Sequence, residues 1–420
     1  MKILQINVTY KTGGSTGRIV FDLRQLMSQN GIENYVTYGI EGSVEDSHDV
    51  RCIQSNLELK ISQLQSRLFS RHGFYNVLAT KRLITFISDI NPDIIHLHNI
   101  HGFYVHCGML FSYIKEKQIP VVWTLHDCWS FTGWCAYFDY SKCNKWRTHC
   151  FDCPSKKDYP KAWITSRARS NYELKKNTFT GVKNLVLVTP SQWLADLTRE
   201  SFLRNYPVRV INNGVNLDAF KPKSNNIKEK LGISDKKMIL AVAGGLAKRK
   251  GRDYLLKLPS MLTDKECLVI LGINADQQSL LPKTRCIGIP YTNSVESLAE
   301  IYSAADVFIN TTLEDNFPTT NLEALACGTP VITFETGGSV EPILNLESFV
   351  SEGNLKKSNV GGVVPKGDID SMVYLLREYY SYKELKGTNV CVEKVFKNYN
   401  STTQYQKYID LYKEILDSIG

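Results

Sequence analysis

The sequence predicts two α/β domains in tandem, each built on a doubly wound parallel sheet. A chain of 420 residues is too long for one ordinary core and fits two domains of about 200 residues each. Its 43% hydrophobic and 22% charged residues are typical of a folded globular protein. Short β-branched runs alternate with longer segments of helical periodicity, which indicates parallel sheets with helices on both faces.

The first series of strands and helices fills the amino-terminal half. Lys2–Val8 is a predicted buried strand, and a glycine-rich loop leads from it into a helix over Arg18–Gln29 with one apolar face. The later strands of this series are Tyr35–Ile40, Asp93–Asn99, Val121–His126, Leu185–Thr189 and Val208–Asn212, and the helices between them include Met109–Lys117 and Gln192–Phe202.

A second series follows a turn near Gly214–Pro222. Its predicted strands are Met238–Ala243, Cys267–Gly272, Asp306–Asn310 and Pro330–Phe334. The expected domains are therefore residues 1–215, with a cysteine-rich insertion at 127–160, and residues 216–395. Residues 396–420 include an amphipathic helix, Thr403–Leu416, that is expected to pack back on the first domain. Ligands of such sheets bind outside the carboxyl ends of the strands, so functional groups are expected in the loops after strands.

The loop and helix after Asp306–Asn310 combine a predicted anion site with two carboxylates. Pro318 suits the start of a helix, and the next three residues offer first-turn N–H groups and side chains to a diphosphate. Asp315 lies just before this helix start, and Glu323 lies one to two turns into the helix. An ordinary helix start with acids placed for the helix dipole gives the same pattern. The predicted diphosphate contacts are Thr319, Thr320 and Asn321.

Asp315 and Glu323, followed by ALACGTP, resemble the acid-x7-acid donor motif of glycosyltransferase family 4. These enzymes are retaining and have the GT-B fold, two Rossmann-like domains that face a central cleft. The resemblance implies that Glu323 hydrogen-bonds the nucleotide ribose and that Asp315 contacts hydroxyls of the donor sugar. The family usually has Glu at the first position, and the adjacent Glu314 leaves a register shifted by one residue open.

Two further loops are similar to those of the family. In GGLAKRKG, Lys250 matches the lysine that binds the donor diphosphate. Gly245 stands where the family has arginine, so Arg249 is the alternative second cation, and an ordinary charged loop also explains Lys250. Gly14 belongs to a glycine-rich loop that would let the backbone approach the ligand. TPSQWL and INNGVNLDAF resemble the family's connection between domains.

Several histidines follow strands of the first domain. His126 ends a predicted strand and resembles the family's histidine near the donor phosphate and the acceptor, although most histidines at strand ends are structural. Alternation along the strand places His96 and His98 on one face. This pattern is compatible with a metal pair, but we favour a hydrogen-bonding role for these two and for His101.

Four cysteines, Cys135, Cys143, Cys150 and Cys153, have the spacing C-x7-C-x6-C-x2-C. A short segment with four thiols predicts a structural zinc site, because the metal supplies the fold that the loop lacks. Disulfides, which a reducing compartment disfavours, and free thiols are the alternatives. A similar cysteine-rich arrangement occurs in family members of colanic-acid and other surface-polysaccharide biosynthesis.

Most of the net charge of +8 is concentrated in Tyr140–Thr180, which holds ten basic residues against three acidic ones. Such a patch can face an anionic membrane, nucleic acid or water. No apolar run is long enough to span a bilayer, and the start of the sequence shows no signal peptide. We therefore expect a cytoplasmic protein that is peripheral on the cytoplasmic membrane face.

These features together predict a retaining hexosyltransferase that needs no catalytic cofactor. The resemblance implies a UDP- or GDP-linked sugar as donor and a lipid-linked oligosaccharide as acceptor, in bacterial surface polysaccharides such as O-antigen, capsule or colanic acid. A GT-B nucleotide-sugar epimerase or hydrolase is the nearest alternative. A Rossmann oxidoreductase is disfavoured because no GxGxxG follows the first strand. A zinc-containing nucleic-acid-binding protein is disfavoured because the basic stretch lacks a recognition-helix pattern.

Overall fold

The computed structural model describes residues 1–11, 15–40, 47–164, 167–242, 244, 246–292, 294–344, 350–386 and 389–419. Two compact units emerge from the contacts within the chain. Unit 1 comprises Met1–Asn212 together with Gln404–Gly420, and unit 2 comprises Asn213–Thr403. The predicted site residues Gly14 and Gly245 lie outside the described residues.

Unit 1 is built on a parallel sheet with the strand order β3-β2-β1-β4-β5-β6-β7. Its central strands are almost wholly buried, as expected for a parallel sheet that is covered on both faces. Two of the observed strands are shorter than predicted: β4 ends at Leu97 and β5 ends at Thr124, so His98 and His126 lie in the loops that follow. The strands are β1 (Lys2–Asn7), β2 (Glu33–Tyr38), β3 (Val50–Cys52), β4 (Ile94–Leu97), β5 (Val121–Thr124), β6 (Leu185–Thr189) and β7 (Val208–Val210).

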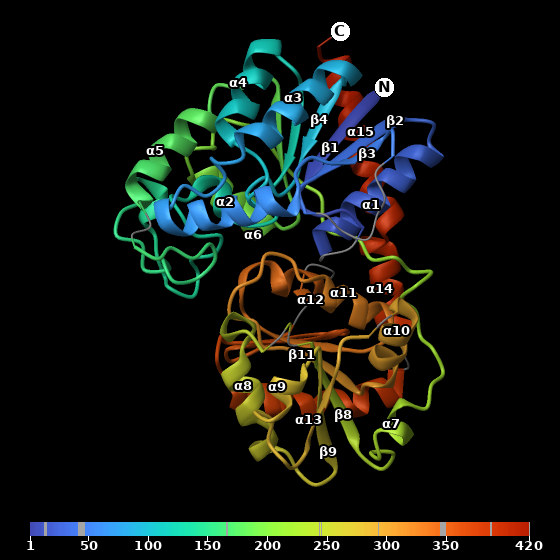
Figure 1. The fold of residues 1–420 in the computed structure, drawn as a ribbon. Helices are drawn as coiled ribbons and strands as arrows, with labels where there is room; N and C mark the ends of the chain where they lie inside the picture. The colour runs from blue at the N-terminus through green and yellow to red at the C-terminus, as the bar shows by residue number, and fades with distance from the viewer. Residues whose placement is uncertain are drawn as a thin grey trace. The chain divides into compact units, whose positions relative to one another are not determined.

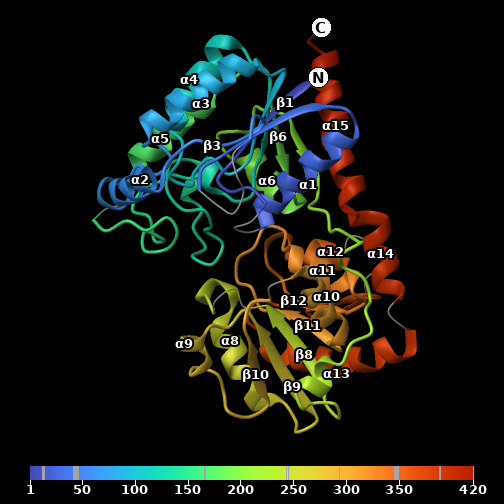
Figure 2. The same ribbon diagram turned by 45° about the vertical axis from the view of Figure 1, so that its right-hand side comes forward.

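Helices cover both faces of this sheet (Figures 1 and 2). The helices are α1 (Ser15–Gln29), α2 (Asn56–Phe69), α3 (Val77–Ile90), α4 (Cys107–Lys117), α5 (Ala168–Phe179), α6 (Gln192–Glu200) and α15 (Ser401–Asp417), with 3-10 turns η1 (Trp129–Phe131) and η2 (Lys145–Arg147). Apolar side chains of α1 and α15 form one core with one face of the sheet, and those of α3, α4 and α5 join the core on the other face. The carboxyl-terminal helix α15 therefore completes unit 1.

Unit 2 has a mixed sheet with the strand order β10-β9-β8-β11-β12-β15-β14-β13, in which β14 runs antiparallel to both of its neighbours. Its strands are β8 (Lys237–Val242), β9 (Glu266–Leu271), β10 (Cys286–Ile289), β11 (Val307–Asn310), β12 (Val331–Phe334), β13 (Val350–Glu352), β14 (Leu355–Ser358) and β15 (Gly361–Val364).

The helices of unit 2 also cover both faces of its sheet (Figure 1). Apolar residues of α10, α11 and α14 pack on one face, and those of α8 and α13 pack on the other. The helices are α7 (Ile227–Lys230), α8 (Arg252–Lys257), α9 (Ala275–Gln278), α10 (Val295–Ala304), α11 (Thr319–Ala326), α12 (Glu341–Leu344), α13 (Ile369–Lys386) and α14 (Asn389–Tyr399), with 3-10 turns η3 (Lys248–Lys250), η4 (Leu258–Met261) and η5 (Gly337–Val340).

The order of the strands brings the predicted functional loops together within each unit. In unit 1, β4 lies between β1 and β5, so the loops after these three strands share one sheet edge. In unit 2, β11 lies between β8 and β12, and all three run parallel. Within the described part of the chain, no helix is both long and apolar enough to cross a membrane.

Candidate functional site

In unit 2, the loop after β8 is fixed against the loop after β11. Gly251 follows η3 with a φ of 81°, and a Cβ at this position would lie 2.0 Å from the main-chain oxygen of Thr311. The N–H of Leu313 donates to the main-chain oxygen of Arg249 over 2.8 Å. Glycine at position 251 is therefore required for the close approach of these two loops.

This approach joins Lys250 to Asp315. The Lys250 ammonium and the Asp315 carboxylate form an ion pair in which both side chains are largely buried. The neighbouring Arg249 donates from Nη1 to the main-chain oxygen of Glu314 over 2.8 Å. Lys250 thus presents a cation beside the start of α11, whereas Arg249 helps to hold the backbone of the loop.

The start of α11 is held by buried amides. Asn321 is fully buried, and its Nδ2 donates to the main-chain oxygen of Ser339 while its Oδ1 accepts from Nδ2 of Asn310. These two bonds tie the first turn to the end of β11 and to the loop after β12. Thr319 and Thr320 are partly exposed at this turn, where the N–H groups of a helix have no partner within the helix.

Glu323 lies farther along α11 and is partly exposed. Its Oε2 accepts a hydrogen bond from the hydroxyl of Tyr302 over 3.0 Å, which orients the carboxylate. Asp315 and Glu323 therefore precede and follow the helix start, as their places in the sequence predict. Tyr302, which belongs to α10, has no signal in the sequence because only the fold brings α10 against α11.

The loop after β12 is a part of this edge that the sequence reasoning missed. Thr336 is buried, and its Oγ1 is without a hydrogen-bond partner in the described structure. Gly337 has a φ of 51°, and Ser339 bonds to Thr333 through their hydroxyls over 2.5 Å. The signal was available, since Thr-Gly-Gly-Ser follows the end of a predicted strand as the other functional loops do.

In unit 1, three histidines form a polar chain: the buried His96 of β4, the buried His98 just after β4, and the partly exposed His126 after β5. The rings of His96 and His98 lie 4.0 Å apart between centroids, on one face of the strand as alternation predicts. His98 Nδ1 lies 3.1 Å from His126 Nε2, and His98 Nε2 lies 3.3 Å from Oε1 of Gln5. His96 Nε2 lies 2.8 Å from the hydroxyl of Thr124.

The carboxyl-terminal helix closes this chain. Tyr412 of α15 places its hydroxyl 2.6 Å from His96 Nδ1, and the hydroxyl of Thr124 donates to that of Tyr408 over 3.2 Å. Both nitrogens of His96 are thereby satisfied in the neutral ring. Burial lowers the pKa of His96 to about 3 and that of His126 to about 4, so both rings are neutral near pH 7.

A second polar chain links His101, Asp127 and Tyr159. His101 Nε2 lies 3.0 Å from Asp127 Oδ2, and His101 Nδ1 lies 3.2 Å from the hydroxyl of Tyr159. Burial alone would raise the pKa of the Asp127 carboxyl, but His101 and the N–H of Trp129 hold it below its usual value. Asp127 thus anchors the loop that carries His126, a role that the sequence did not suggest.

The four clustered cysteines lie in or against the core of unit 1. None of the eleven cysteines forms a disulfide. The Cys135 thiol donates a hydrogen bond to the sulfur of Cys153 and lowers the pKa of Cys153 to about 7, whereas burial raises the pKa of Cys150 to about 11. Among the described residues, no group of three or more His, Cys, Asp or Glu side chains is placed to hold a metal ion. The arrangement therefore gives no support to the predicted zinc set, which includes Cys143.

Two family models match the chain, and both describe glycosyltransferases. "Glycosyltransferase Family 4" matches residues 17–219, and "Glycosyl transferases group 1" matches residues 223–381. The putative colanic acid biosynthesis glycosyl transferase WcaC of Escherichia coli (strain K12) is 28% identical over 357 residues, which are 81% of this chain and 85% of WcaC.

Solved structures of glycosyltransferases share the fold at low sequence identity. Sucrose-phosphate synthase from Thermosynechococcus elongatus is similar with a TM-score of 0.70 and 16% identity, and 99% of each chain is covered. Anabaena HepE in complex with UDP-glucose is similar with a TM-score of 0.65 and 15% identity over the full length of both chains. The predicted GT-B fold is thus confirmed.

Proposed function

The chain is a glycosyltransferase of the GT-B type that carries a family 4 domain and a group 1 domain, and we propose that it transfers a sugar, with retention, from a UDP- or GDP-linked donor to a lipid-linked oligosaccharide. The observation that carries this proposal is the Lys250–Asp315 pair beside the start of α11. The similarity of the chain to WcaC favours a role in bacterial surface-polysaccharide biosynthesis.

The donor site proposed in unit 2 combines a cation with a helix start. The donor diphosphate would bind Lys250 and the first-turn N–H groups of Thr319 and Thr320. It would compete with Asp315 for the ammonium, which leaves that carboxylate able to accept from hydroxyls of the donor sugar. The Glu323 carboxylate, which the Tyr302 hydroxyl orients, would accept a hydrogen bond from a hydroxyl of the nucleotide ribose.

The same groups would lower the barrier to transfer. As the bond between the anomeric carbon and the diphosphate oxygen breaks, its electron pair moves to the diphosphate, and Lys250 and the helix start stabilise the growing charge. The acceptor hydroxyl forms the new bond on the same face of the sugar, and its proton passes to the leaving phosphate. This course follows the chemistry of the resembling family and needs no protein nucleophile.

His126 is proposed to meet the acceptor. If His98 donates from Nε2 to Gln5, its Nδ1 accepts from Nε2 of His126, and the lone pair of His126 is then on Nδ1. A neutral ring in this tautomer suits the orientation of an acceptor hydroxyl better than a contact with phosphate.

Replacing Glu323 with Ala is expected to weaken nucleotide-sugar binding by roughly 10- to 100-fold, the loss of one charged hydrogen bond. The measurement is titration calorimetry with UDP- and GDP-sugars, together with assays of transfer and of free-sugar release. Tyr302→Phe, which removes only the orienting hydroxyl, should have a smaller effect, and Asp276→Ala, at an exposed site, should have none. Unchanged affinity in Glu323→Ala would exclude the ribose contact. Rapid donor turnover without an acceptor would favour the hydrolase alternative.

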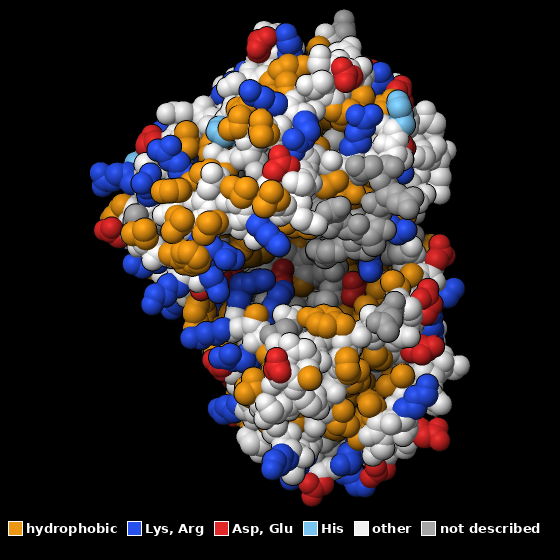
Figure 3. Space-filling model, viewed as in Figure 1, with side chains coloured by type: hydrophobic (Ala, Val, Ile, Leu, Met, Phe, Trp, Pro, Cys, Tyr) orange, Lys and Arg blue, Asp and Glu red, His pale blue; other side chains and the backbone are white. Residues whose placement is uncertain are grey.

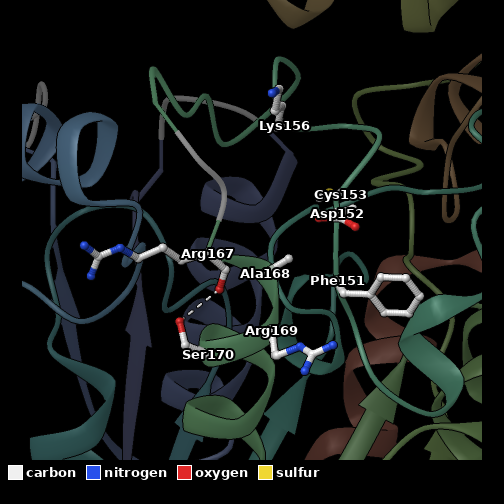
Figure 4. A pocket seen from close by; sticks show the side chains of 8 residues that line it. All are labelled: Phe151, Asp152, Cys153, Lys156, Arg167, Ala168, Arg169 and Ser170. Atoms are coloured by element: carbon white, nitrogen blue, oxygen red, sulfur yellow. Dashed lines mark hydrogen bonds between the residues drawn. The ribbon is translucent and has the colours of Figure 1, made fainter.

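The acceptor part of the proposal rests on the basic segment Tyr140–Thr180. Eight of its ten basic side chains are exposed, whereas Lys175 is buried and donates to the main-chain oxygens of Trp129 and Thr132. A pocket of about 740 Å³ lies in this segment and is lined by Lys156, Arg167 and Arg169 among others. Figure 4 shows these three side chains pointing in different directions, as suits a broad anionic surface better than a single small anion.

Neutralising Lys156, Lys157, Arg167 and Arg169 to Gln is expected to reduce binding to anionic vesicles while donor affinity is unchanged. Each basic residue near an anionic surface contributes roughly 1 kcal/mol, and added salt screens this attraction. Co-sedimentation with vesicles with and without phosphatidylglycerol, at low and high salt, measures the effect. The matched control changes Lys221, Lys230, Lys265 and Lys283, four exposed lysines of unit 2, to Gln. Equal binding to neutral and anionic vesicles would contradict the role of this segment.

A further inference from the structure

Four of the six large apolar side chains of helix α2 are exposed, and the other two, Leu59 and Leu68, are partly buried. Leu57, Ile61 and Leu64 are 68%, 48% and 49% exposed, and their spacing of four and three residues places them on one helical face. The opposite face contacts unit 1 through Ser62 and Ser66, which are fully buried. This is the reverse of a helix on a soluble domain, whose apolar face packs on the core.

The helix is held firmly in this orientation. Ser55 and Glu58 form a capping box at its start, and Ser70 ends it in the left-handed conformation with a φ of 52°. Arg82 of α3 donates two hydrogen bonds of 2.7 Å to the Glu58 carboxylate and one to the main-chain oxygen of Ile53. The exposed apolar face is therefore a feature of an ordered and well-anchored helix.

Two residues that follow the cysteine-rich insertion, Trp163 and Ile164, extend this apolar face. The main-chain N–H of Trp163 donates to the main-chain oxygen of Arg67, near the end of α2, over 3.0 Å. The Arg67 guanidinium lies 5.8 Å from the centre of the Trp163 ring. Trp163 and Ile164 are 57% and 71% exposed, and Phe69 of α2 is also exposed.

Basic residues surround the apolar side chains. Figure 3 shows hydrophobic side chains gathered over α2, with Lys and Arg side chains around them. The exposed basic residues of α2, α3, the loop between them and residues 156–169 are Lys60, Arg67, Arg71, Lys81, Arg82, Lys156, Lys157, Lys161, Arg167 and Arg169. Glu58, the acidic residue of α2, is neutralised by Arg82.

We propose that this face, formed by α2 together with Trp163 and Ile164, is the surface by which the protein binds an anionic phospholipid bilayer. The apolar side chains would enter the boundary between headgroups and acyl chains, and the surrounding cations would contact the anionic headgroups, as in helices that lie in the plane of an interface. Tryptophan is a side chain suited to this depth. The proposal deepens the membrane part of the proposed function, because it assigns the docking face and adds apolar insertion to charge attraction.

The test changes Leu57, Ile61 and Leu64 together to Gln in the full chain and measures flotation with vesicles of phosphatidylcholine and phosphatidylglycerol. Binding is expected to fall roughly tenfold or more, because each of the three side chains leaves water on binding. The matched control changes Leu280, Val350 and Phe396 of unit 2 to Gln, three apolar side chains with similar exposed fractions. Circular dichroism and nucleotide-sugar affinity report whether the variants are folded.

A second readout comes from Trp163, which is the most exposed of the six tryptophans. Its emission should shift to the blue on vesicle binding and be quenched by brominated acyl chains, and Trp163→Phe should abolish most of this change. Wild-type binding by the triple variant, with loss of binding in the Lys156, Lys157, Arg167 and Arg169 variant, would overturn this inference and leave the proposed membrane role standing. Absence of vesicle binding by the wild type would overturn both. A wild-type dimer that the triple variant converts to a monomer would instead assign this face to a second copy of the chain.

Discussion

Lys250→Ala is expected to slow sugar transfer by a factor of roughly 30 to 1000 with little change in the fold. The ammonium group stands beside the start of α11 and is paired with Asp315, so it is fixed before the donor binds. A fixed cation stabilises charge that develops on the leaving diphosphate without reorganisation, and its loss costs about 2–4 kcal/mol of transition-state stabilisation. Steady-state kinetics should show the loss mainly in kcat.

Two companion variants separate this role from general charge. Lys248→Ala removes an exposed lysine from the same 3-10 turn and should leave kcat near that of the wild type. Lys250→Arg keeps the charge with a different geometry and should recover part of the rate. If Lys250→Ala transfers sugar at the wild-type rate, Lys250 has no part in the mechanism.

Unit 1 is expected to lose stability as the pH falls from about 6.5 to 5, while unit 2 keeps its stability. All eight histidines of the sequence lie in unit 1. Three of them, His72, His96 and His98, are almost fully buried, and burial holds the pKa of each well below its usual value. The folded protein keeps these rings neutral, whereas the unfolded chain binds protons below about pH 6.5.

The sign and the size of the effect follow from proton binding. The unfolded state binds more protons in this window, so the free energy of unfolding falls as the pH falls, by at most about 2 kcal/mol per histidine near pH 5. Asp22 acts in the opposite direction, because burial raises its pKa to about 6 and the folded state then binds the extra proton. The buried histidines outnumber this one carboxyl, so the net effect of acidification on unit 1 is a loss of stability.

Hydrogen exchange measured by mass spectrometry at several pH values, corrected for the intrinsic rate, assigns the loss to peptides of each unit. Core peptides of β4 and β5 should lose protection, and those of β8 and β11 should not. His98→Gln is expected to flatten the dependence in unit 1, whereas His48→Gln, at an exposed site, should not. A parallel loss in both units above pH 5 would contradict the role of the buried histidines.

Much of the fold followed from local patterns in the sequence. The runs Lys2–Val8 and Met238–Ala243 are apolar because central parallel strands are buried on both faces. The alternation of such runs with helical segments indicates that the strands run parallel to one another. Functional groups were predicted in the loops after strands, because the carboxyl ends of parallel strands lie at a common edge of the sheet. Asp315, Glu323 and Lys250 could be proposed as site residues because they stand in or just after such loops at a spacing that resembles a known family.

Other features depend on which distant segments meet. Tyr302 orients Glu323 only because α10 packs beside α11, and Tyr412 bonds His96 across more than three hundred residues of chain. The pairing of Lys250 with Asp315 joins loops after neighbouring strands that are separated in sequence. Periodicity describes one element at a time and contains no information about such partners.

Local patterns were enough to predict the two α/β domains, the loops that carry the candidate donor site, and the basic character of Tyr140–Thr180. Which faces these elements present depends on the tertiary structure. The apolar spacing of α2 alone would place Leu57, Ile61 and Leu64 in the core, but the helix contacts unit 1 through Ser62 and Ser66. The four cysteine positions predicted a zinc site, and that site stays a prediction, whereas the burial of Cys135 and Cys150 among apolar side chains comes from the fold. Burial is a property of the whole assembly of elements, because it depends on what lies opposite each side chain, and no local pattern specifies that.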